Sequence, residues 1–171
     1  MLTIKGVFLS VVGAIFLILF LHYSPPVDNS IKVDKIVVKK SKRVLEIYSK
    51  DRLIKSYKIS LGFNPVGKKH FQGDGKTPEG KYYINDKNPY SKFHKNLGIS
   101  YPNQADKAFA RKRGKSPGGA IKIHGLPNGY GWLGRIHLLW DWTAGCIALT
   151  DEEIDELYKI IKVGTPVWIK P

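Results

Sequence analysis

The sequence predicts a mainly β domain with a few helices, folded in a β-sandwich-like manner and preceded by one N-terminal transmembrane helix. Three observations carry this prediction. Short runs rich in β-branched and aromatic residues recur along the chain, Gly and Pro turns separate them, and only two segments after the N-terminus have helical features. The 171 residues, 43% of them apolar, also suit one domain that buries its own core.

Composition excludes several classes of protein. The single Cys rules out an intrachain disulfide framework, and the 12% of aromatic residues argues against disorder despite a net charge of +14. A folded, basic, turn-rich domain follows from these numbers.

Residues 1–23 are expected to form an uncleaved signal anchor. The run Gly6–Leu21 carries no charge and follows Lys5, and together with its apolar flanks it approaches the length needed to cross the ~30 Å hydrocarbon core. No convincing small-residue cleavage site follows it, and Lys5 favours a cytoplasmic N-terminus. A cleaved signal peptide and a buried core helix remain alternatives. We therefore expect a single-pass protein of the cytoplasmic membrane, with its domain on the periplasmic or extracellular side.

The predicted domain begins after a short linker. The Pro25-Pro26 pair marks a stiff linker over residues 24–32, and the domain occupies residues 33–171. Its predicted elements are, in order, strands at 36–38, 44–48 and 53–61, a loop at 73–80, a strand at 81–84, a helix at 104–113, a strand at 120–124, a helix beginning after Thr150 and a strand at 166–169.

The last helix has the clearest start. Thr150 and Glu153 match a capping box, and Leu149 and Ile154 match the hydrophobic staple that accompanies such a box. Gly164 is expected to supply the left-handed residue that ends this helix.

Pleat alternation places two chemically active side chains off the apolar faces of their strands. His124 alternates with Ile121 and Ile123, and Cys146 alternates with Ile147 and Leu149. A free thiol is unusual in an exported protein, so Cys146 needs a reason to be present.

Two glycines adjoin these residues, Gly125 after the histidine and Gly145 before the cysteine, and each permits a close backbone approach to a ligand. A thiol, an imidazole and nearby backbone N–H groups are the components of a nucleophilic cysteine site. His124 would take the thiol proton or form an ion pair with the thiolate.

Two other readings of these residues stay open at this point. Cys146 and His124 could be an inert thiol and a satisfied structural histidine. A metal site built from His124, His137, Asp141 and Cys146 is a further alternative, although their spacing differs from that of common zinc sites.

The segments at 123–125 (Ile-His-Gly) and 143–149 (Thr-Ala-Gly-Cys-Ile-Ala-Leu), followed by an acidic capped helix, resemble the YkuD-type L,D-transpeptidase catalytic domain family. The segment at 75–82 resembles its Thr-Pro-x-Gly element, and the strands within 35–62 resemble its opening meander. The resemblance covers most of residues 33–170.

The resemblance implies an enzyme that acts on the peptide stems of peptidoglycan. Cys146 would be the nucleophile, His124 its base, and the Gly125 carbonyl the group that orients the imidazole. An acyl-enzyme would form on the diamino acid of the stem, with release of the terminal D-alanine. Transfer to an amine would cross-link the wall or attach a protein, and transfer to water would trim the stem. Members need no cofactor, and carbapenems acylate their cysteine.

We expect Gly145, Thr143, Trp132 and Lys122 to bind substrate. Trp132 lies in an insertion between the histidine and cysteine motifs, which is either a lid over the site or a surface turn. His137, in the same region, competes with His124 for the role of base.

Two positions depart from the pattern of the family. Ala144 and Ala148 stand where many members have His and Arg, so the resemblance does not assign the group that binds the substrate carboxylate. A membrane-anchored wall-binding module without activity is therefore the rival to the enzyme.

The basic segments point to anionic partners. Between Lys32 and Lys58, ten Lys and Arg accompany three acidic residues, a local charge of +7 (10 minus 3), and residues 111–115 add a second basic cluster. Anionic lipids or wall polymers would suit this charge, and an ordinary solvated face is the alternative. Nucleic acid is not expected, because export would separate the chain from it.

Overall fold

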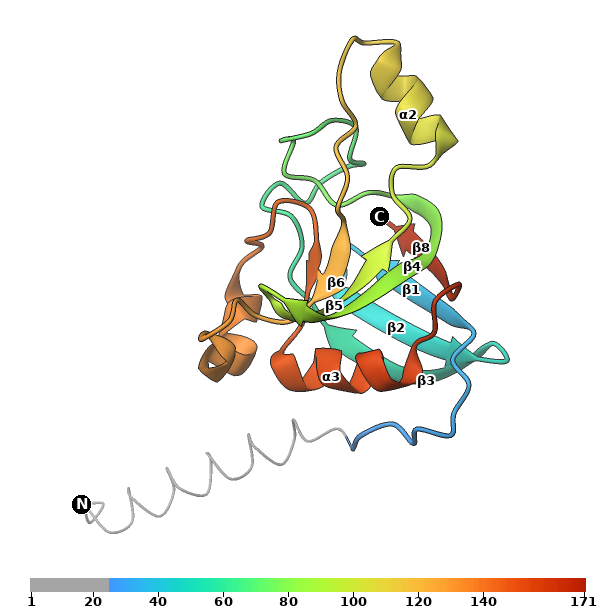
Figure 1. Cartoon of the computed structure of the whole chain (residues 1–171), viewed down its shortest axis with the longest axis vertical. Coiled ribbons are helices and arrows are strands. Elements are labelled where there is room, and N and C mark those ends of the chain that lie inside the picture. Colours follow the sequence, from blue (N-terminus) through green and yellow to red (C-terminus); the bar gives the residue numbers. More distant parts are fainter. Residues whose placement is uncertain (1–24) are drawn as a thin grey trace, which may run out of the picture.

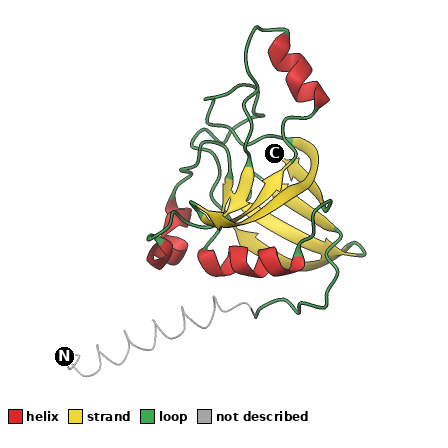
Figure 2. Ribbon diagram, viewed as in Figure 1, coloured by secondary structure: helices red, strands yellow, loops and turns green. Residues whose placement is uncertain are grey.

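The computed structural model describes residues 25–171, which form a β-rich domain with three helical elements (Figures 1 and 2). The predicted anchor of residues 1–23 lies outside the described residues. In the described range no helix has the length and apolar character needed to span a membrane.

The first three strands form the predicted antiparallel meander. They are β1 (Lys35–Lys39), β2 (Val44–Ser49) and β3 (Arg52–Lys58). Lys50 and Asp51 both adopt positive φ in the tight turn between β2 and β3. Strand β3 ends at Lys58, whereas the predicted third strand ran to residue 61.

Five further strands complete one sheet in the order β3-β2-β1-β8-β4-β5-β6-β7. Strand β8 pairs parallel to β1, and the long strand β4 continues the sheet into its second half. The bounds are β4 (Gly80–Ser91), β5 (His94–Ile99), β6 (Lys122–His124), β7 (Ile147–Ala148) and β8 (Pro166–Lys170).

The sheet is curled, and its two ends meet. Ser60, just after β3, forms a bridge with Ala148 of β7, and Gly62 forms a bridge with Thr143. A single curled sheet, tied together at its ends by these two bridges, thus stands where a β-sandwich-like fold was predicted. This closure brings the end of the meander directly against the segment that carries Cys146.

Two α-helices have capping boxes at their starts. Helix α2 (Gln104–Arg111) begins after Asn103, whose box with Asp106 the sequence reading missed. Helix α3 (Asp151–Ile160) has the predicted box, in which Thr150 Oγ1 accepts a hydrogen bond from the N–H of Glu153.

One face of α3 packs onto the core, where Ile154, Leu157 and Ile160 are buried. At roughly 1.5–3 kcal/mol for each fully buried aliphatic side chain, this face is a major source of stability. Gly164 has the expected positive φ, but it lies in the turn before β8, since the helix already ends at Ile160.

The insertion between the two motifs forms a third helical element, η1 (Gly131–Leu139). It consists of two 3-10 segments with a kink at Gly134, whose φ is 44°. This segment was expected to be a lid or a surface turn, and its helical turns were not predicted.

Candidate active site

Cys146 and His124 line one cavity of about 300 Å³. His124 ends β6, and Cys146 directly precedes β7, which pairs parallel to β6 through Ile123 with Ile147 and His124 with Ala148. The two motifs, distant in sequence, are therefore brought together by one strand pair.

The His124 imidazole is buried and held in a defined orientation. Its Nδ1 lies 2.7 Å from the Gly125 carbonyl oxygen, and because a carbonyl only accepts, Nδ1 carries the proton. Phe93 packs 4.6 Å from the imidazole, between ring centroids, and Trp142 lies edge-on at 5.8 Å. Nε2 is left with the lone pair that can take a proton from a thiol.

Gly125 permits helix α3 to pack against the histidine loop. A Cβ at this position would lie 2.5 Å from Asp151 Oδ1 and 3.0 Å from the Ile154 side chain. The same Asp151 oxygen accepts a hydrogen bond of 2.8 Å from the N–H of Leu126. The first turn of α3 thus fixes the backbone on both sides of the Gly125 carbonyl.

The cysteine loop is held by the side chain of Thr143. Its Oγ1 donates a 2.8 Å hydrogen bond to the Cys146 carbonyl and accepts a 3.1 Å bond from the N–H of Gly145. The Thr143 backbone in turn bonds to Leu61 and Phe63 on the closing side of the sheet. Thr143 therefore shapes the loop that presents the half-buried Cys146 thiol.

A second loop, which contains Lys76 and Thr77, packs against the cysteine loop. Gly145 has a φ of 126°, and a Cβ there would lie 2.5 Å from the Lys76 carbonyl oxygen. The adjacent Thr77 accepts a 3.0 Å hydrogen bond from the N–H of Gly62. The backbone just before the Thr-Pro element therefore lies directly against the cysteine motif.

One lysine of the predicted basic surface is instead buried against this loop. Lys40 is only 3% exposed, and its ammonium donates to the Thr77 carbonyl and pairs with Glu79 at 2.7 Å. Lys40 is thus a structural residue and adds nothing to a polyanion-binding face.

The surroundings favour a neutral resting pair. Burial lowers the pKa of His124 below its ordinary value, against a smaller opposing effect of the Gly125 carbonyl. Burial raises the pKa of the Cys146 thiol, partly offset by the backbone N–H of Lys122 and by nearby lysine charges. Both directions disfavour a thiolate–imidazolium pair, so the arrangement suits His124 as a general base during attack.

The predicted substrate-binding residues separate into two groups. Lys122 and Thr143 line the cavity, and Gly145 shapes its cysteine loop, although the Thr143 hydroxyl is engaged within that loop. Trp132 is 75% exposed on η1 and is not among the residues that line the cavity. The structure therefore does not bring Trp132 to the cysteine.

Other cavity residues escaped the sequence reading. Phe93, Asn96 and Trp142 line the cavity. Asn96 lies opposite His124 in the β5–β6 pairing, is 7% exposed, and has a carboxamide oxygen with no hydrogen-bond partner among residues 25–171. Strand β5 was not predicted, so Asn96 gave no signal. Trp142 directly precedes Thr143 of the cysteine motif, and this position in the sequence could have indicated that it lies at the cavity.

His137 occupies a different place from His124. It is buried on the far side of Trp142, whose indole N–H donates to His137 Nδ1 at 3.4 Å, and it lines a separate apolar cavity of about 210 Å³. Burial, with a smaller effect of His124, lowers the pKa of His137 to about 4. Its surroundings suit a structural histidine.

The alternative metal site does not assemble. The Asp141 carboxylate is engaged by the Arg43 guanidinium at 2.8–3.2 Å and by the N–H of Leu61. Within residues 25–171, no three His, Cys, Asp or Glu side chains gather as a metal ion would require.

Comparison with known proteins identifies the arrangement. Residues 33–169 match the family model described as the YkuD L,D-transpeptidase catalytic domain. The chain is 32% identical over 143 residues to the putative L,D-transpeptidase YafK of Escherichia coli K12, covering 80% of this chain and 50% of that protein.

Solved structures agree on the fold. The helical cell shape determining protein Pgp2 of Campylobacter jejuni superposes with a TM-score of 0.62 at 28% identity, over 84% of this chain and 51% of the other. An L,D-transpeptidase of Mycobacterium smegmatis shares the fold, with a TM-score of 0.53 at 14% identity over 80% of this chain and 58% of that one. The chain thus spans about half the length of the curated relative it matches.

Proposed function

Because the chain belongs to the YkuD L,D-transpeptidase catalytic domain family, we propose that it performs cysteine-dependent acyl transfer on the stem peptides of peptidoglycan. The observation that carries the proposal is the shared cavity of Cys146 and His124, with His124 Nδ1 bonded to the Gly125 carbonyl. That arrangement leaves a basic nitrogen and a thiol facing one space of a size that suits a peptide group.

The proposed first step breaks one peptide bond. His124 Nε2 takes the thiol proton as Cys146 Sγ attacks the carbonyl carbon of the diamino acid, which forms a tetrahedral oxyanion. The S–C bond is kept, the C–N bond to the terminal D-alanine breaks, and the imidazolium returns its proton to the leaving amine. The products are a thioester on Cys146 and free D-alanine.

The second step consumes the thioester. An acceptor amine or water gives a proton to His124 and attacks the thioester carbonyl, and the thiolate leaves and recovers the proton. An amine acceptor yields a cross-link or an attached protein, and water yields a shortened stem.

The oxyanion needs donors close to Cys146. The N–H of Gly145 is already bonded to Thr143 Oγ1, so we assign the oxyanion contact to the backbone N–H of Cys146. This choice follows from which donors the cysteine loop leaves available.

Two cavity residues are assigned to substrate recognition. The Lys122 ammonium, 2.7 Å from a half-exposed Asp86 carboxylate, can exchange this surface partner for a carboxylate of the stem. The Asn96 side chain lines the cavity, and rotation of its carboxamide would turn the buried, unpartnered oxygen toward a peptide N–H of the substrate. Many family members have an arginine at the position of Ala148, which is buried on β7 in this chain. Lys122 would supply the cation that this position lacks.

We further propose that residues 1–23 attach the domain to the outer face of the cytoplasmic membrane. The support is the uncharged run of residues 6–21 and the docking of the next segment on the domain, where Lys55 donates a 2.9 Å hydrogen bond to the Pro25 carbonyl. The wall material nearest the membrane would then be the substrate.

The proposed reaction is tested with a purified disaccharide tetrapeptide and mass analysis of its products. Wild-type protein should release D-alanine and form a trimmed or dimeric product, and the Cys146→Ala variant should do neither. Equal product from both proteins would refute the assignment of Cys146.

A further inference from the structure

The insertion between the two motifs carries an unusual set of exposed apolar side chains. Here the apolar insertion denotes residues 126–140, in which Arg135 is the one formally charged residue, whereas 25% of the whole chain is charged. Five large side chains on it are more than half exposed: Tyr130 (54%), Trp132 (75%), Ile136 (51%), Leu139 (78%) and Trp140 (53%). A concentration of large exposed apolar side chains in one segment is typical of an interaction site.

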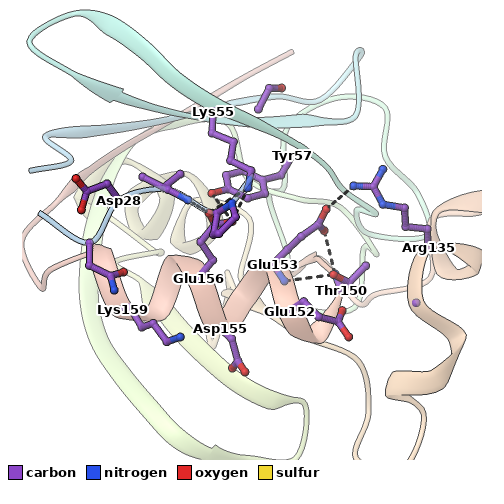
Figure 3. A pocket seen from close by; sticks show the side chains of 15 residues that line it. Asp28, Lys55, Tyr57, Arg135, Thr150, Glu152, Glu153, Asp155, Glu156 and Lys159 are labelled. Carbon is purple, nitrogen blue, oxygen red and sulfur yellow. Dashed lines mark hydrogen bonds and ion pairs between the residues drawn. The ribbon is translucent and has the colours of Figure 1, made fainter. Parts of the chain in front are cut away.

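The apolar insertion is tied to helix α3. Arg135 Nη2 lies 3.0 Å from Glu153 Oε1, a carboxylate whose side chain is 12% exposed (Figure 3). The hydrogen bonds of Thr150 with Glu153 place this contact at the first turn of the helix.

The start of the described chain is tied to the same helix. Glu156 accepts hydrogen bonds from the N–H of Val27, from Tyr57 and from Lys55, whose ammonium lies 2.8 Å away (Figure 3). Glu153 and Glu156 are three residues apart, so they lie on neighbouring turns of one helix face.

A single cleft joins these two segments. Residues 26–29 line it together with Gly134 and Arg135 of the apolar insertion and the intervening face of α3, in a volume of about 890 Å³. Gly134 and Arg135 of the apolar insertion and residues 26–29, near the start of the described chain, therefore border the same cleft.

From this placement we propose that the apolar insertion docks on a lipid bilayer. The inference rests on the proposed membrane attachment, because a membrane that receives residues 6–21 must lie close to Pro25 and hence beside the apolar insertion. Trp and Tyr side chains favour the membrane–water interface, and the Leu and Ile side chains favour the acyl boundary. The catalytic cavity, one wall of which is Trp142, would then open near the bilayer surface.

Tryptophan quenching tests the proposal on the full chain. The protein is reconstituted into phosphatidylcholine and phosphatidylglycerol vesicles that contain lipids brominated at a shallow acyl position. Of the four tryptophans, Trp132 and Trp140 should contribute most of the bromine-quenched emission. The Trp132→Phe/Trp140→Phe double variant should lose at least half of the quenched intensity. Trp168→Phe, on strand β8, is the matched control and should lose little.

The outcomes separate the two proposals and the proposed reaction. Failure of wild-type protein to float with the vesicles would refute the membrane attachment and the docking together. Flotation with unchanged quenching in the double variant would overturn the docking alone. Trp132 and Trp140 that are shielded from bromine, because residues 6–21 or a stem peptide covers them, would also overturn it. Turnover of a soluble muropeptide by the same wild-type preparation reports the proposed reaction separately.

Discussion

Replacement of Thr143 by Val tests whether one hydroxyl holds the nucleophile loop. Val keeps the shape of the side chain but removes the oxygen that donates to the Cys146 carbonyl at 2.8 Å and accepts from the Gly145 N–H at 3.1 Å. Thr143 is 4% exposed, so water does not readily replace the lost partners.

The expected magnitude follows from these two bonds. Each contributes about 0.5–1.5 kcal/mol net, and an unpartnered buried group costs about 1–3 kcal/mol, so we expect the free energy of unfolding to fall by about 2–4 kcal/mol. If instead the loop shifts without unfolding, a loss of about 1–3 kcal/mol in the transition state slows turnover by roughly five- to 150-fold.

Denaturant unfolding, together with turnover of a disaccharide tetrapeptide, measures both quantities. The matched control is Thr143→Ser, which keeps the hydroxyl and loses a methyl group worth about 0.8 kcal/mol. Equal stability and equal turnover of the Thr143→Val and Thr143→Ser variants would show that the hydroxyl does not hold the loop.

Three further predictions address the cavity. Replacing His124 by Ala should lower turnover by at least about a hundredfold, as expected for loss of a general base, whereas His137→Ala should act mainly on thermal stability; the reverse ranking of turnover would move the base to His137. The rate of iodoacetamide alkylation of Cys146 should rise with pH to a midpoint above 9.0, the thiol's ordinary pKa, because burial raises the pKa of Cys146. The acid limb of the pH profile of turnover should have its midpoint below pH 6.5, because burial lowers the pKa of His124 from its ordinary value of 6.5. An alkylation midpoint well under pH 9 would contradict the neutral pair. Lys122→Ala should raise KM for a stem peptide more than it lowers kcat, with Lys122→Arg as the matched control, and Asn96→Ala should lower kcat/KM by about tenfold, the effect of roughly one lost hydrogen bond; unchanged constants would remove either residue from recognition.

Much of the fold could be predicted because its signals are local. Runs rich in β-forming residues, with clear alternation in the third, predicted the meander, and the capping box of Thr150 and Glu153 predicted the start of α3. Strand β5 escaped because residues 96–99 are buried without alternation and include Gly98, so no period of two is visible.

The proposed nucleophile and base could be singled out from motif chemistry, whereas the residues that surround them in the cavity could not. His124 and Cys146 have distinctive reactivity and neighbouring glycines that sequence shows directly. Asn96 and Phe93 reach the cavity through pairing on β5 and the turn before it, which is long-range information. Trp132 was expected at the substrate because it lies between the motifs, but it is 75% exposed on η1 and is not among the residues that line the cavity.

Intact-protein mass spectrometry with a carbapenem tests the account most directly. Wild-type protein should gain the mass of one carbapenem, with the adduct mapped to Cys146, and His124→Ala should form the adduct at least about a hundredfold more slowly. The Cys146→Ser variant, which keeps the loop and replaces the thiol by a hydroxyl, serves as the control and should remain unmodified over the same period. An adduct on another residue, or equal rates with and without His124, would contradict the proposal that Cys146 is the nucleophile and His124 its base.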